Sequence, residues 1–147
     1  MKLHHPLRAV AICAAISLLA ACSSKADRLH QGLEKGAEYV RLADWDKANV
    51  EVRNVLQIDP KNAQAYLING QVSEGQRDIQ RAYGAYSKAV ELKPDLIEAQ
   101  VGLARIYLMA GEIAKAQATV TEVLAADPQL DLVHVLLLLD VLDRGET

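Results

Sequence analysis

Three prolines recur at a fixed interval, and this interval constrains the fold more than any other feature of the chain. Pro60, Pro94 and Pro128 lie 34 residues apart, and the residue twelve positions before each of them is an alanine. A period of this length indicates one supersecondary unit that is copied and stacked, because a single copy cannot bury its own apolar face. The sequence therefore predicts a repeat protein whose fold follows from one unit.

Each unit has the pattern of two helices. In the second copy, apolar residues recur three and four positions apart over 65–72 and again over 79–92, as in helices with one buried face. Proline ends each second helix, because its ring cannot continue the hydrogen-bond ladder. We therefore predict an all-α fold, an α-solenoid of antiparallel helix pairs. The expected helices cover residues 27–42, 45–58, 62–75, 78–92, 96–109, 112–126 and 130–143.

The expected helix ends carry residues that are typical of caps and turns. Asn62 is expected to cap the third helix, and Asp95 the fifth, with Glu98 three residues later reaching back to the cap. Glycine tolerates a left-handed helix end at little cost. We therefore expect Gly75 and Gly111 to end the first helices of the second and third copies.

The repeated residues resemble the tetratricopeptide repeat (TPR), in which Trp, Leu, Gly, Tyr, Ala, an aromatic residue, Ala and Pro recur over 34 residues. The second copy matches this pattern at Tyr66, Gly70, Ala82, Tyr86, Ala89 and Pro94. The resemblance implies an array over residues 29–147. Its copies are expected at about 29–62, 63–96 and 97–130, with a partial fourth at 131–147. An unrelated helical hairpin array with the same proline spacing would have nearly the same architecture.

Residues 1–21 have the pattern of an export signal. Lys2 and Arg8 are followed by 13 uncharged residues, fewer than the about 20 that span a bilayer. The sequence Leu-Ala-Ala-Cys at 19–22 then resembles the lipobox of bacterial lipoproteins. This resemblance implies cleavage before Cys22 and attachment of a lipid, with acyl chains such as palmitate, to its sulfur. An ordinary export signal followed by an unmodified Cys22 is the alternative, and it would give a soluble exported protein.

The residue after Cys22 bears on the location. In the lipoprotein family an aspartate at this position tends to retain the protein at the inner membrane, whereas this chain has Ser23. The resemblance therefore implies the inner leaflet of the outer membrane, facing the periplasm. Residues 22–28 would form a short linker, so that the repeats would lie close to the membrane.

Charge and composition exclude several functions. Without Lys2 and Arg8, 14 basic and 19 acidic residues remain, which gives a net charge of −5. The absence of a basic stripe argues against nucleic acid as a partner. His30 and His134 are about a hundred residues apart, with no nearby cysteine to complete a metal site. We therefore predict no metal, no cofactor, no catalytic residue and no small-molecule substrate.

The TPR resemblance implies that the first helix of each copy lines a concave face that binds a peptide or a partner helix. The predicted concave-face residues are His30, Leu33, Ala37, Val40, Gln64, Leu67, Gln71, Glu74, Glu98, Val101, Arg105 and Leu108. Leu33, Leu67 and Val101 stand where TPR clamps for chaperone tails have Lys or Asn, which favours an amphipathic helix or extended segment as the partner. In the alternative interpretation, these aliphatic side chains only support neighbouring helices.

These patterns together predict a non-enzymatic, lipid-anchored scaffold that holds protein partners in an envelope assembly. Family resemblance offers two settings, polysaccharide export and pilus or secretin biogenesis. The alternative is the amino-terminal TPR module of a longer enzyme or regulator. The expected helix over 130–143 has almost no polar face, so we expect it either to continue into a longer array or to pack against a partner subunit.

Overall fold

The computed structural model describes residues 25–126, all in helices and short turns. A leading helix covers residues 25–41. The next helices are α2 (Trp45–Ile58), α3 (Ala63–Gly75), α4 (Ile79–Leu92), α5 (Ile97–Met109) and α6 (Ile113–Ala126). The predicted linker over 22–28 is helical from residue 25 onward. The predicted export signal, Cys22 and the helix expected over 130–143 lie outside the described residues.

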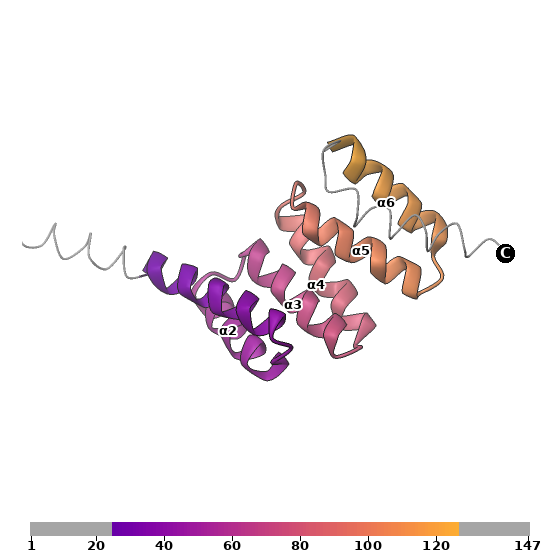
Figure 1. The fold of residues 1–147 in the computed structure, drawn as a ribbon. Coiled ribbons are helices and arrows are strands. Elements are labelled where there is room, and N and C mark those ends of the chain that lie inside the picture. The colour runs from indigo at the N-terminus through magenta and orange to yellow at the C-terminus, as the bar shows by residue number, and fades with distance from the viewer. Residues whose placement is uncertain (1–24, 127–147) are drawn as a thin grey trace, which may run out of the picture.

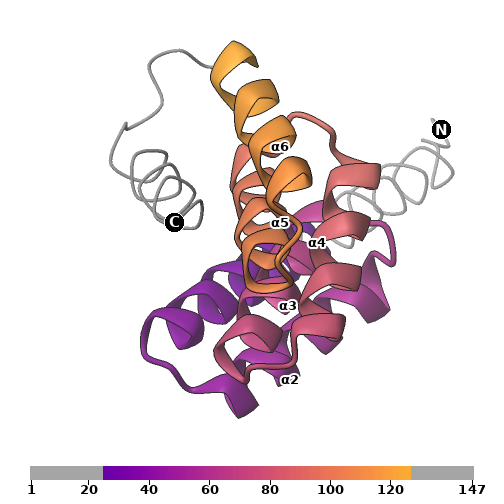
Figure 2. The same cartoon turned by 90° about the vertical axis from the view of Figure 1, so that its right-hand side faces the viewer.

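The helices follow one another along the molecule in chain order. Figure 1 shows the indigo leading helix and α2 at one end, α3 and α4 in the middle, and α5 and the yellow-orange α6 at the other end. Figure 2 shows the same order from a direction at 90° to the first. From α2 onward each helix packs on its sequence neighbours, and α3 also contacts α5, so the first helices of the second and third pairs touch directly. The predicted α-solenoid of helix pairs is confirmed.

The turn inside each helix pair has the same backbone geometry in all three copies. Ala43, Arg77 and Gly111, which are 34 residues apart, have φ angles of 56°, 62° and 73°. In each turn, the N–H of the following residue donates to the carbonyl five residues earlier, at 2.8 to 2.9 Å. This pattern is the Schellman helix end. The prediction for Gly111 is confirmed. In the second copy Gly75 is the last residue of α3, as predicted, but the left-handed residue is Arg77.

The predicted helix starts are correct in one case and wrong in another. Asn62 caps α3, because its Oδ1 accepts a hydrogen bond from the N–H of Ala65 at 3.0 Å. Asp95 does not cap α5, and its predicted capping box with Glu98 is absent, because the cap residue is Leu96 and no side chain bonds there. Leu96 is only 6% exposed and belongs to the core. Burial of Leu96 therefore sets where α5 begins, one residue later than a cap at Asp95 requires.

A tyrosine ring fills the space between the second and third helix pairs. Tyr86 of α4 is fully buried. A Cβ atom added to Gly70 would lie 2.5 Å from its ring, and one added to Gly102 would lie 2.7 Å from it. Both distances are too short for real atoms, so the two glycines on α3 and α5 form the slot for the ring. Gly70, which matches the glycine of the TPR pattern, thus makes room for the side chain of a neighbouring helix.

The first two helix pairs meet through a different set of contacts. A cluster containing Ala48, Val52, Ile68 and Val72 lies between them, with Trp45 packed against it. A Cβ atom on residue 75 would lie 2.5 Å from the ring of Trp45. The glycine expected to form a turn is therefore required because the indole of α2 lies directly against the end of α3.

Candidate functional site

The predicted concave face is carried by the leading helix, α3 and α5, the first helices of the three pairs. The structure places its twelve residues in three environments. The exposed residues are His30, Ala37, Gln64 and Glu98. The half-buried residues are Leu33, Val40, Gln71, Glu74, Arg105 and Leu108. The buried residues are Leu67 and Val101.

Two of the predicted residues belong to the packed core and not to an open surface. Leu67 is 3% exposed and lies in a cluster with Ala82 and Tyr86. Val101 is 9% exposed and lies in a cluster with Val120. Both side chains therefore support neighbouring helices, as the alternative interpretation of the sequence holds. Changing either one would disturb packing, so neither is suitable for probing a binding surface.

A hydrogen-bonded network joins α3, α4 and α5 at the predicted concave face. Arg105 donates from Nε to Oε1 of Glu74 at 2.8 Å and from Nη2 to Oε2 at 2.9 Å. The hydroxyl of Tyr86 donates to the same Oε2 at 2.6 Å. Paired N–H donors from one guanidinium match the two oxygens of a carboxylate. The carboxylate of Glu74 therefore accepts three hydrogen bonds from two different helices.

The network favours the charged forms of the acid and the base. Burial alone would raise the pKa of Glu74, but hydrogen bonds from Arg105 and Tyr86 outweigh burial and hold that pKa below its usual value. The hydrogen bond to Glu74 is the main cause of the raised pKa of Arg105. Burial, followed by the bond to Glu74, raises the pKa of Tyr86. At neutral pH the three groups are an anion, a cation and a neutral donor.

The sequence indicates parts of this network without assembling it. Glu74 and Arg105 are both predicted concave-face residues, but the prediction does not pair them, and Tyr86 is identified only as a match to the TPR pattern. The acid and the base are 31 residues apart, which is one repeat less three residues. This offset places them on consecutive first helices, less than one turn apart in the repeat frame. The spacing could have revealed the pair, but no sequence signal shows that the tyrosine hydroxyl reaches it.

Two surface hollows lie outside the predicted concave face. One of about 350 Å³ lies between the leading helix and α2, and its lining includes Gln31, Lys35 and other polar side chains. The other, of about 430 Å³, is bordered by α4, α5 and the start of α6. Tyr83 and Tyr107 line the second hollow with ring centroids 5.9 Å apart, and Nζ of Lys115 lies 5.7 Å from the centroid of the Tyr107 ring.

A metal site and a membrane-spanning helix are two further features that the described residues could carry. Between residues 25 and 126, no group of three His, Cys, Asp or Glu side chains is placed to hold a metal ion. His30 is exposed on the leading helix, 3.5 Å from the carboxylate of Glu34. In the same stretch of chain, no helix has the length and apolar character needed to cross a membrane. The expectations of no metal and no catalytic residue stay predictions.

Comparison with known proteins gives a family match for part of the chain. A tetratricopeptide repeat model matches residues 74–139. The BBSome complex member BBS4 of Bos taurus is 30% identical over 93 residues, which are 63% of this chain and 18% of that protein. The chain thus spans less than a fifth of the length of this curated relative.

Solved structures match a larger share of the chain. The TPR domain of Arabidopsis OM64 has a TM-score of 0.73 at 16% identity, over 82% of this chain and 98% of that domain. The first TPR of Spaghetti (RPAP3), bound to the HSP90 peptide SRMEEVD, has a TM-score of 0.72 at 16% identity, over 81% of this chain and 93% of that one. At these identities the likeness concerns the fold alone. The chain has a TPR-like helical solenoid fold.

Proposed function

We propose that this chain is a lipid-anchored scaffold that binds protein segments on the concave face of its TPR-like solenoid. The observation that carries the proposal is the character of the first helices, which present exposed and half-buried side chains of mixed polarity beside one another. Repeat solenoids bind partners on such extended surfaces because stacking leaves one face of each first helix uncovered. The peptide in the Spaghetti structure supports a protein segment as the kind of ligand.

The lipid anchor and the location belong to the same proposal. The lipobox-like sequence at 19–22 favours lipid attachment at Cys22, and Ser23 favours the inner leaflet of the outer membrane, facing the periplasm. Two or three acyl chains hold a protein firmly at a membrane, because each buried methylene contributes about 0.8 kcal/mol. The described repeats begin only a few residues after the proposed anchor. They would therefore work close to the membrane surface.

The biological setting is proposed from resemblance. An envelope assembly such as the machinery of polysaccharide export or of pilus and secretin biogenesis needs adaptors that hold several proteins at one membrane. A second candidate, a TPR module within a longer enzyme or regulator, is favoured by the small share, 18%, that the match covers of the curated relative.

The binding face is tested with exposed residues, whose replacement leaves the core intact. We expect that Ala37→Arg combined with Gln64→Arg abolishes capture of envelope proteins by the full chain from detergent-solubilised membranes. Val50→Arg combined with Gln57→Arg is the matched control, because both residues are exposed on α2, a second helix. Identical captured proteins with all three chains would contradict the assignment of the concave face.

The anchor is tested by mass spectrometry of the protein recovered from bacterial membranes. We expect an amino-terminal Cys22 that carries a diacylglyceryl group, and Cys22→Ala should release the protein into the soluble fraction. An unmodified cysteine at the mature amino terminus would remove the anchor while leaving the proposed binding face untouched.

A further inference from the structure

The basic group of the predicted concave face is already bound within the molecule. Among the twelve predicted residues, Arg105 is the one Lys or Arg side chain. Its guanidinium holds both carboxylate oxygens of Glu74 at 2.8 and 2.9 Å. A carboxylate from a partner would seek the same donors in the same paired geometry. Glu74 therefore occupies the position that an acidic ligand would take on Arg105.

Displacing Glu74 would be unfavourable. The side chains of Arg105 and Glu74 are 38% and 21% exposed, so the pair is partly removed from water and only weakly screened. The hydroxyl of Tyr86 donates a further hydrogen bond to the carboxylate, at 2.6 Å, and the ring of that tyrosine is fixed between two glycines. A displaced Glu74 would lose three hydrogen bonds while its own backbone stayed in place. An incoming carboxylate would lose translational and rotational entropy on binding to Arg105, whereas Glu74 is part of the same chain and does not.

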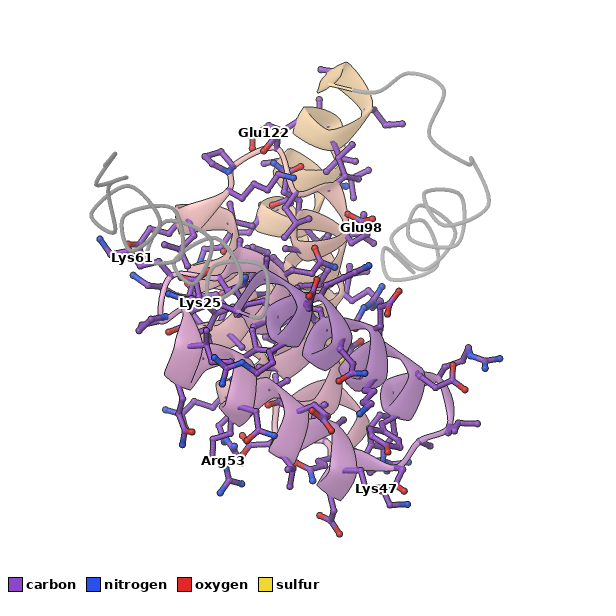
Figure 3. The ribbon with its side chains drawn as sticks, turned by 90° about the vertical axis from the view of Figure 1, so that its left-hand side faces the viewer. Lys25, Lys47, Arg53, Lys61, Glu98 and Glu122 are labelled. Atoms are coloured by element: carbon purple, nitrogen blue, oxygen red, sulfur yellow. The ribbon has the colours of Figure 1, made fainter. Side chains whose placement is uncertain are left out.

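The remaining charge on this face is negative. Glu98, at the start of α5, is exposed, and it lies apart from the labelled cations Lys25, Lys47, Arg53 and Lys61 (Figure 3). Leu33, Val40 and Leu108 add half-buried aliphatic surface. With Arg105 neutralised by Glu74, the described part of the face combines aliphatic patches with an exposed carboxylate.

We infer that Glu74 acts as an internal ligand of Arg105, which closes the concave face to acidic segments and makes it select an amphipathic segment with basic side chains. This inference rests on the proposed function and names the chemical class of its partner. The peptide SRMEEVD, held by the Spaghetti TPR, carries three acidic side chains and belongs to the excluded class. Opposite charges on the face and the segment favour their encounter, whereas like charges repel a wrong partner.

The test measures the affinity of the full chain for two labelled peptides of equal length and identical apolar pattern, one built from Leu and Lys and the other from Leu and Glu. We expect the wild-type chain to bind the Leu/Lys peptide at least tenfold more tightly. Glu74→Gln should raise the affinity for the Leu/Glu peptide about tenfold, because Arg105 then loses its anionic partner. The double variant Glu74→Gln/Arg105→Gln should lose that gain.

A second variant tests the preference for basic segments if Glu74→Gln does not fold. Glu98→Gln changes an exposed side chain and should weaken binding of the Leu/Lys peptide about threefold, as expected for an exposed charge pair. Glu122→Gln is the matched control on α6, also exposed, and should leave the affinity unchanged. Equal effects of these two variants would indicate general attraction to an acidic protein and would overturn the inference.

The outcomes separate this inference from the proposed function. Wild-type protein that binds the Leu/Glu peptide as tightly as the Leu/Lys peptide contradicts the inference, even if the chain captures envelope proteins through its concave face. A folded Glu74→Gln variant whose affinity for the Leu/Glu peptide is unchanged also contradicts the inference. Wild-type protein that captures no envelope protein contradicts the proposed function instead.

Discussion

The two described junctions between consecutive helix pairs use the same frame positions with different side chains. At the first junction, Val52 and Ile68 belong to one aliphatic cluster between the first two pairs. Thirty-four residues later, the corresponding positions carry Tyr86 and Gly102, and the tyrosine ring fills the space that a side chain on residue 102 would need. The two aliphatic side chains of the first junction are thus replaced at the second by one aromatic ring and one glycine.

The two junctions also differ at the frame positions of the ion pair. The positions of Glu74 and Arg105 correspond to Val40 and Gln71 in the preceding copy. The first junction therefore has an aliphatic side chain and an uncharged polar side chain at the place where the second has a bidentate ion pair. The repeat determines where neighbouring pairs meet, whereas the individual residues determine whether they are held by packing alone or also by charge. At both junctions some of the contacting residues belong to the predicted concave face, namely Leu33 and Val40 at the first and Glu74 and Arg105 at the second.

The largest effect is expected for removal of the tyrosine ring. Tyr86→Ala should lower the free energy of unfolding by about 3 to 5 kcal/mol, the range for truncating a buried aromatic residue. Val52→Ala, at the corresponding position, should cost less because fewer atoms are lost. Urea denaturation followed by circular dichroism measures both. Equal losses at the two positions would show that the tyrosine has no special part in its junction.

Transferring the ring to the first junction should be destabilising. Val52→Tyr should cost about 1 to 3 kcal/mol through overpacking, because Ile68 occupies the space that a glycine leaves free at the next junction. Combining Val52→Tyr with Ile68→Gly should cost less than the sum of the two single changes. Strict additivity in urea denaturation would mean that the two positions do not share one space.

The ion pair makes the second junction dependent on pH. Folding lowers the pKa of Glu74, so the unfolded chain binds the proton more readily. The stabilisation is complete above about pH 4.3, the ordinary value for glutamate, and is lost as the pH falls through the lower pKa of the folded state. Glu74→Gln should cost about 1 to 2 kcal/mol at neutral pH and should reduce the loss on acidification.

Urea denaturation between pH 7 and pH 3 measures this dependence. Glu122→Gln, a change at an exposed position on α6, is the control and should keep the wild-type profile. A Glu74→Gln profile that runs parallel to the wild-type one would show that the carboxylate is not stabilised by folding.

The smallest effects are expected at the shared left-handed turn position. Arg77→Gly should stabilise the chain by about 1 kcal/mol, because a non-glycine residue is strained at positive φ, and Gly111→Ala should destabilise it by a similar amount. Thermal melts of the two variants should therefore shift in opposite directions. Shifts in the same direction would contradict the shared turn geometry.

Much of the architecture could be predicted from the sequence, because proline spacing and helical periodicity act locally. The range of α2 is as predicted, and α3 to α6 each begin one residue later than predicted. The leading helix begins two residues earlier and ends one residue earlier. The misassigned positions depend on contacts between helices. Leu96 replaces Asp95 as the cap residue of α5 because its side chain is buried, and Gly75 is small because the indole of Trp45 lies against it.

The candidate site was less predictable for the same reason. The repeat frame indicates which residues of a first helix face away from its partner helix, but it does not show how the neighbouring copy covers them. Leu67 and Val101 are consequently buried although the frame places them on the concave face. The frame includes Glu74 and Arg105, but their pairing depends on side-chain reach across two helices, and the bond from Tyr86 depends on the slot between Gly70 and Gly102.

The most direct test of the contrast between the junctions is a double-mutant cycle on Glu74→Gln and Arg105→Gln, measured by urea denaturation at neutral pH. The structure predicts a coupling free energy of about 1 to 3 kcal/mol, because each single change leaves a half-buried charge without its partner. A matching cycle on Val40→Ala and Gln71→Ala at the first junction should give a much smaller coupling. A coupling between Glu74 and Arg105 below about 0.3 kcal/mol, within the scatter of independent sites, would contradict the account.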